Sequence, residues 1–81
     1  MKFEKITVHC YSGYRVNESP RFLLWRGKKY FIKRIVDRWY EGGIKSDSDI
    51  MDYYKVELDD GTVRIIRYNR LFDGWGILIE S

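Results

Sequence analysis

The sequence predicts an all-β domain in which five or six antiparallel strands form a strongly bent meander, as a small SH3-like or half-closed barrel. Three observations predict it. Eighty-one residues supply apolar side chains for one core, so residues 1–81 are expected to form a single domain. β-Branched and aromatic residues recur in short runs between glycine and Asx turns. No apolar run keeps a helical period, and small twisted sheets commonly curl to hide their edges.

The first strand is expected over residues 3–11, where Ile6, Val8 and Cys10 alternate with polar side chains. The segment "SGYRVNESP" is typical of a loop. Pro20 lacks an amide hydrogen, so it suits the start of the second strand, which is expected to continue to Arg26.

The segment "WRGKKY" predicts a hairpin. A type II′ turn at Gly27-Lys28 would pair Trp25 with Tyr30. The face opposite to Trp25 then holds Leu24, Arg26, Lys29, Phe31 and Lys33.

The third strand is expected to run to about Glu41. Its apolar residues change face between Ile32 and Ile35, which predicts a β-bulge or a strong bend near Lys33-Arg34. The polar stretch "EGGIKSDSDIMD" predicts a loop, with a turn of helix started by Ser46 and Asp49.

The segment "YYKVELDDGTVRIIRY" predicts a second hairpin. A type I′ turn at Asp60-Gly61 would pair Leu58 with Val63 and Val56 with Ile65. Asp73-Gly74 is the next turn, and "WGILIES" follows it as the last strand.

Charge is unevenly spread along the chain, although the net charge is only +3. Seven cations and one acid lie between residues 21 and 38, whereas seven acids and two lysines lie between residues 41 and 60. Arg64, Arg67 and Arg70 restore positive charge. Such polarity either steers an anionic partner or lets two parts of one sheet attract each other.

Catalytic and metal sites find little support in the sequence. His9 and Cys10 are neighbours on a strand and point to opposite faces, so they cannot share a zinc ion. The acidic stretch 47–52 lacks the ligand spacing of a calcium loop. His9 could serve Ser12 or Cys10 as a base, but no third group supports a catalytic site, and the glycines form no phosphate loop. We therefore expect no enzyme and no cofactor.

Aromatic residues among cations favour a nucleic-acid surface, because cations follow phosphates and rings stack on bases. Tyr40 and Tyr68 are further candidate rings. The alternative is an ordinary half-buried sheet, which gives the same alternation of aromatic and basic residues, and Trp25, Trp39 and Trp75 are expected in its core. The candidate residues are Arg26, Lys28, Lys29, Phe31, Lys33, Arg34, Arg64 and Arg67.

The single cysteine and the absence of a signal-peptide pattern predict a cytoplasmic protein. No run approaches the length of a membrane span, so no membrane partner is expected. The function expected from the residues is that of a non-enzymatic binding module for single- or double-stranded nucleic acid. The alternative is a protein–protein interaction module, or a small subunit of a larger enzyme.

Four landmarks resemble a small, functionally uncharacterised bacterial domain family: "WRGKKY", "FIKRIV" followed by Trp39, "YYKVELDDG" and "GWGILIE". The resemblance covers the chain from about Pro20 to its end. Some members of that family stand beside Y-family translesion DNA polymerases, so the resemblance implies an accessory role in DNA repair. It carries no catalytic residue.

Overall fold

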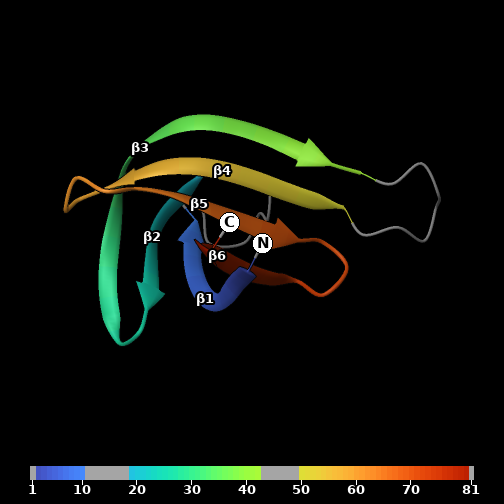
Figure 1. Ribbon diagram of the computed structural model, residues 1–81, viewed down its shortest axis with the longest axis horizontal. Coiled ribbons are helices and arrows are strands. Elements are labelled where there is room, and N and C mark those ends of the chain that lie inside the picture. Colours follow the sequence, from blue (N-terminus) through green and yellow to red (C-terminus); the bar gives the residue numbers. More distant parts are fainter. Residues whose placement is uncertain (1, 11–18, 43–49, 81) are drawn as a thin grey trace.

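Six antiparallel strands close into a barrel in the computed structural model, which describes residues 2–10, 19–42 and 50–80 (Figure 1). Each strand pairs with its neighbours in the sequence, and the first strand pairs with the last. The predicted all-β class and the predicted number of strands are therefore confirmed. The strands are β1 (Lys2–Cys10), β2 (Pro20–Trp25), β3 (Lys28–Glu41), β4 (Met51–Leu58), β5 (Val63–Asn69) and β6 (Gly74–Glu80).

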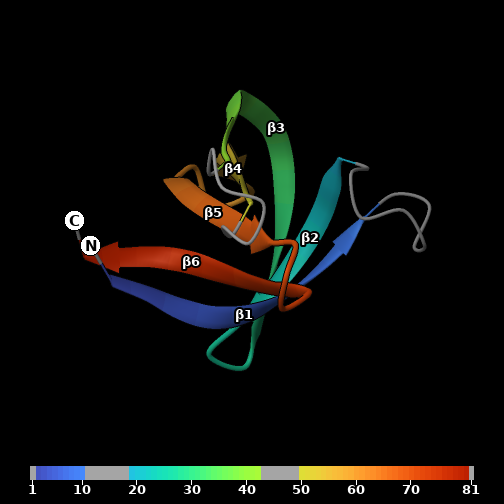
Figure 2. The same ribbon diagram turned by 90° about the vertical axis from the view of Figure 1, so that its right-hand side faces the viewer.

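Two strands turn the corners of the barrel. In β1, residues 2–6 pair with β6 and residues 7–10 pair with β2, so β1 and β6 lie side by side at one edge of Figure 2. In β3, the first residues pair with β2 and the rest pair with β4. The register of β3 shifts between Ile32 and Arg34, which confirms the predicted bulge, and shifts again between Ile35 and Asp37. These bulges bend the strand, so that it pairs with β2 at its start and with β4 over the rest of its length.

The β2–β3 hairpin differs from its prediction. Its turn is Arg26-Gly27, with φ angles of 52° and 75°, as a type I′ turn requires. Trp25 therefore pairs with Lys28 and not with Tyr30, so the predicted pairing was wrong. The slip is two residues, an even number, and each side chain keeps its predicted face.

The β4–β5 hairpin also differs, and here the slip is one residue. The Gly61 amide donates to the Leu58 carbonyl (2.9 Å), and the Leu58 amide donates to the Thr62 carbonyl (2.8 Å). Asp60 Oδ1 accepts hydrogen bonds from the Thr62 amide and hydroxyl, which holds a turn longer than the predicted two residues. Val56 thus pairs with Arg64, so the predicted partners Ile65 and Val63 were wrong.

The core lies inside the barrel. Its buried side chains come from β1, β2, β4, β5 and β6, and β3 packs the partly buried Tyr30, Ile32 and Ile35 against them. The fully buried members of the core are Leu23, Tyr54, Val56, Leu58, Ile66 and Ile77. Trp25 is also buried, and Trp75 packs against the core from a partly buried position, as expected. Trp39 was wrongly expected inside: it is 39% exposed and stacks on Tyr53 outside the barrel. The helical turn expected at Ser46 and Asp49 lies outside the described residues.

A substitution at Gly61 tests the backbone conformation of the β4–β5 turn. The Gly61 φ of +87° is strained for any residue with a Cβ, although a Cβ there would meet no atom within 4 Å. We expect Gly61→Ala to lower the free energy of unfolding by about 1–2 kcal/mol. Gly42→Ala is the control, because its Cβ would make ordinary contacts no closer than 3.5 Å and no left-handed φ is required. Urea midpoints that shift equally for both variants would contradict this account.

Buried tyrosines predict a loss of stability at alkaline pH. Burial raises the pKa of Tyr68 from 10.0 to about 12, and its hydrogen bond to Asp73 acts in the same direction. Burial also raises the pKa of Tyr53 and Tyr54. A pKa that is higher in the folded state means that the stabilisation is complete below pH 10 and is lost as the pH rises toward 12.

Phenolate absorbance and urea midpoints measured over the same pH range check this prediction. Tyr68→Phe should remove the latest phenolate transition and lessen the loss of stability between pH 10 and 12. A single transition near pH 10 for every tyrosine of the folded protein would count against it.

Candidate nucleic-acid interface

The structure does not place the eight candidate residues on one surface. Three of them lie together on the outward face of β3: Lys29, Phe31 and Lys33, the last of these in the bulge. All three are exposed. This group is the part of the predicted surface that the fold brings together.

Three other candidates surround Trp25 at one end of the barrel. The Arg26 guanidinium pairs with Glu4 (Nη2 to Oε1, 2.8 Å), and the same carboxylate accepts a hydrogen bond from Trp25 Nε1 (3.0 Å). Arg26 and Arg64 both lie within 5 Å of the Trp25 ring centroid, at 4.9 and 4.8 Å. Lys28 lies over the Tyr30 ring. These cations cap the core, and Arg26 is already paired with an acid.

The last two candidates lie elsewhere. Arg34 donates a hydrogen bond to Glu57 on the neighbouring strand (2.7 Å), so an acid from a distant part of the sequence offsets its charge. Arg67 projects from β5, and its guanidinium lies 3.8 Å from the Phe3 ring centroid.

A row of three aromatic side chains crosses β1, β2 and β3 beside the first group. His9 pairs with Phe22, and Phe22 pairs with Phe31, so the three rings lie in one cross-strand row on the outward face. The His9 and Phe22 rings stack at 4.5 Å with an interplanar angle of 18°. The Phe22 and Phe31 centroids are 5.8 Å apart. We call His9, Phe22 and Phe31, together with Lys29, the aromatic platform.

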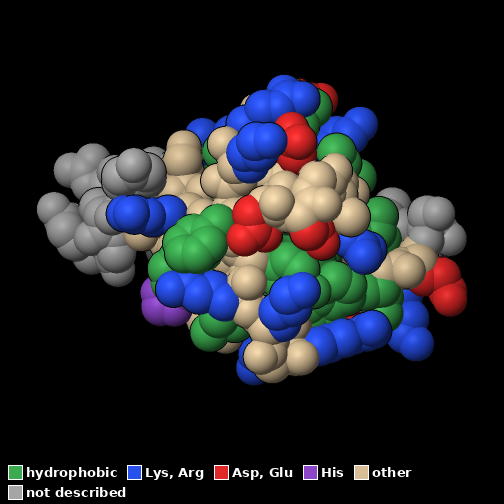
Figure 3. All heavy atoms as spheres, turned by 90° about the vertical axis from the view of Figure 1, so that its left-hand side faces the viewer, with side chains coloured by type: hydrophobic (Ala, Val, Ile, Leu, Met, Phe, Trp, Pro, Cys, Tyr) green, Lys and Arg blue, Asp and Glu red, His purple; other side chains and the backbone are tan. Residues whose placement is uncertain are grey.

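Lys29 lies over this row. Its Nζ is 4.2 Å from the Phe22 ring centroid and 4.8 Å from that of Phe31. Phe31 is 45% exposed, and Leu24 on the same face is 40% exposed. Figure 3 shows Lys and Arg side chains between hydrophobic ones beside the single histidine. The platform therefore offers the exposed rings of His9 and Phe31 and a positive charge to solvent, whereas Phe22 is half-buried between its neighbours.

Negative charge is scarce around the platform. Residues 20–33, which include β2 and the first part of β3, contain no Asp or Glu. The nearest acid in the hydrogen-bond pattern is Asp59, whose amide donates to the Phe31 carbonyl (2.9 Å). An anionic ligand can therefore approach along β2 and the first part of β3 without meeting a carboxylate of those segments.

Sequence reasoning missed Phe22 altogether and considered His9 only as a metal ligand or a catalytic base. Both residues occupy outward positions of their strands, and that alternation is visible in the sequence. What the sequence does not show is the register between β1 and β2, because no two-residue turn is predicted between them. Of the two further rings considered, Tyr68 is buried, whereas Tyr40 is 70% exposed far along β3.

Comparison with protein-family models, with curated proteins and with solved structures found no significant match. Within the described residues, no three His, Cys, Asp or Glu side chains come together as metal ligands. The described residues also form no helix of the length and apolar character that a membrane span requires. The fold and this geometry define the class, a small closed β-barrel with an exposed aromatic and basic surface.

Proposed function

We propose that the protein is a non-enzymatic module that binds single-stranded nucleic acid on the aromatic platform. The observation that carries the proposal is the cross-strand row of His9, Phe22 and Phe31 with the Lys29 ammonium above it. A contiguous group of exposed apolar side chains on a small protein often marks an interaction site. Unpaired bases are suitable ligands, since every base has a flat face that can stack on such rings.

Stacking and phosphate neutralisation act together at this surface. A base that stacks on Phe31 takes the place of the Lys29 ammonium over the ring and moves that ammonium toward the phosphate. Lys33 is exposed two residues further along β3 and offers a second positive charge. A paired duplex hides its base faces, so the platform favours single strands over double strands. Because some members of the family that the sequence resembles stand beside translesion polymerases, we include DNA repair in the proposal as the setting.

Salt dependence tests the proposal. We expect single-stranded oligonucleotides to bind at low salt and to bind less well as salt increases, because counterions are released from the phosphates. The variant Lys29→Glu, Lys33→Glu should bind much more weakly, and its slope of log K against log salt should shrink by about 1.4, roughly 0.7 for each lost phosphate contact. Fluorescence titration at two salt concentrations measures both quantities.

The control variant is Lys2→Glu, Lys55→Glu, which makes the same change in net charge at two exposed lysines outside the platform. If both variants lose affinity equally, binding depends on net charge and the platform is not the site. Native protein that binds no oligonucleotide at low salt would refute the proposal.

A protein partner is the second candidate, and the β5–β6 turn favours it. Leu71 and Phe72 are 64% and 73% exposed there. The turn is held in shape, since Asn69 Oδ1 accepts hydrogen bonds from the amides of Leu71 (2.9 Å) and Phe72 (3.1 Å). The affinity of a partner that binds this apolar turn would depend little on salt concentration. Binding would be lost in a Phe72→Asp variant.

A further inference from the structure

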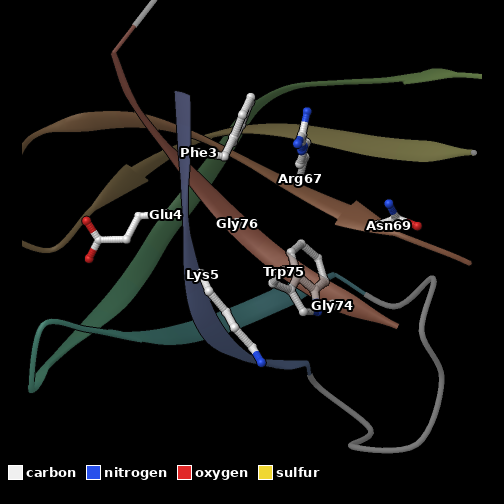
Figure 4. Close-up of a pocket in the computed structure, with 8 residues that line it drawn as sticks. All are labelled: Phe3, Glu4, Lys5, Arg67, Asn69, Gly74, Trp75 and Gly76. Carbon is white, nitrogen blue, oxygen red and sulfur yellow. The ribbon is translucent and has the colours of Figure 1, made fainter. Parts of the chain in front are cut away.

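A groove outside the platform lies where β6 runs between β5 and β1 (Figure 4). Its volume is about 220 Å³. Gly74 and Gly76 of β6 leave its floor without side chains. The side chains around this floor are Phe3 and Lys5 from β1 and Arg67 and Asn69 from β5; the groove is also lined by Glu4 and Trp75.

Glycine at position 76 keeps the groove open. Arg67, Gly76 and Lys5 lie in one cross-strand row, so a side chain at position 76 would stand between the two cations. A Cβ there would lie 3.3 Å from the Phe3 Cβ, closer than ordinary contact. The backbone at Gly76 is itself buried, but it carries no side chain, so the space between Arg67 and Lys5 is not filled from β6.

The groove is positively charged. Among the described residues, neither Lys5 nor Arg67 forms a salt bridge. The Glu4 carboxylate is bound to Trp25 and Arg26, and Figure 4 shows it pointing away from the other lining side chains. The Arg67 Cζ lies 3.8 Å from the Phe3 ring centroid, and this contact restricts the orientation of the guanidinium. A fixed guanidinium is well suited to hold two phosphate oxygens at once.

One strand connects the groove with the platform. Alternate residues of β1 point outward: Phe3 and Lys5 belong to the groove, and His9 belongs to the platform. Lys5 and His9 are four residues apart, a distance of about 13 Å along a strand. Between them, β1 changes its partner from β6 to β2. The path from one surface to the other is therefore short, and Thr7 is the outward residue along it.

We propose that this groove binds the phosphodiester backbone of the same single strand whose bases stack on the platform. The bound strand follows β1 from His9 to Lys5, and Arg67 and Lys5 hold the phosphates over Gly76. The Asn69 Nδ2 group can donate to a sugar or a base edge, whereas Asn69 Oδ1 already accepts from the Leu71 and Phe72 amides. This inference rests on the proposed function, because it extends that binding site by a second segment.

Oligothymidylates of increasing length test the extension. Affinity should keep rising beyond about two nucleotides, one for each exposed ring of the platform, toward about eight, a length within the usual range for small barrels. Lys5→Gln, Arg67→Gln should weaken binding of the longer oligonucleotide roughly tenfold or more and reduce its salt slope by about 1.4. The same variant should bind the shortest oligonucleotide as native protein does. Lys5→Gln alone should give part of the loss without touching the packing of Phe3.

The possible results separate the two proposals. If the double variant binds long oligonucleotides as tightly as native protein, the groove inference is wrong and the platform proposal stands. If native protein binds neither length, both are wrong. If a glutamate-rich peptide binds at Lys5 and Arg67 in an NMR titration and oligonucleotides leave those signals unchanged, the groove serves a protein partner and the inference is overturned.

Discussion

Replacement of Phe31 by Ala is expected to weaken the binding of single-stranded oligonucleotides by about 1–3 kcal/mol, a loss of roughly 5- to 150-fold. Phe31 is 45% exposed, and its ring contacts are with Phe22 and the Lys29 ammonium on the outside of the barrel. Its removal opens no cavity in the core, so the urea midpoint should change little. The loss of affinity therefore reports on stacking and not on folding.

Two further substitutions separate stacking from general apolar contact. Leu24→Ala removes an apolar side chain that is 40% exposed on the same face, and we expect it to bind nearly as native protein does. Phe31→Leu keeps apolar area but has no flat ring, so it should bind as weakly as Phe31→Ala, whereas Phe31→Tyr should retain most of the affinity. Full affinity in Phe31→Leu would show that the ring does not stack on a base.

The sequence predicts which face of a strand a residue occupies more securely than it predicts the pairing of strands. The β2–β3 register slipped by two residues, and Phe31 still lies outward between cations, as its place in the alternation indicates. The β4–β5 register slipped by one residue, which moved Arg64 to the inward face opposite Val56. The cause is local: Asp60 bonds to Thr62 and lengthens a turn whose Asp-Gly pair favours two residues.

Whether a cation is paired with an acid depends on contacts between segments that are distant in the sequence. No local sequence pattern predicts those contacts. Arg26 and Glu4 are separated by 22 residues, and Arg34 and Glu57 by 23. A charge count along residues 21–38 treats both arginines as available, although the fold supplies each of them with an acid. The aromatic row has the same origin, because His9 reaches Phe22 only after β1 and β2 pair. The strand pairing that closes the barrel thus determines which residues come together in the candidate site.

The ion pair between Asp52 and Arg70 should have the largest effect on stability, and the effect should depend on which partner is removed. Asp52 is 5% exposed, and its two carboxylate oxygens accept hydrogen bonds from Arg70 Nε (2.8 Å) and Nη2 (3.0 Å). The Arg70 side chain is 48% exposed. Arg70→Met leaves a buried carboxylate without its partner, whereas Asp52→Asn leaves a guanidinium that water can reach.

We therefore expect Arg70→Met to lower the free energy of unfolding by about 3 kcal/mol, the lower end of the range for breaking a buried pair, since Arg70 is half in solvent. Asp52→Asn should cost only about 1 kcal/mol, close to one net hydrogen bond. Urea midpoints of the two variants give the comparison, and Arg38→Met, which removes an exposed arginine outside this pair, is the control. If Asp52→Asn proves the more damaging change, burial of the carboxylate is not the reason that the pair stabilises the barrel.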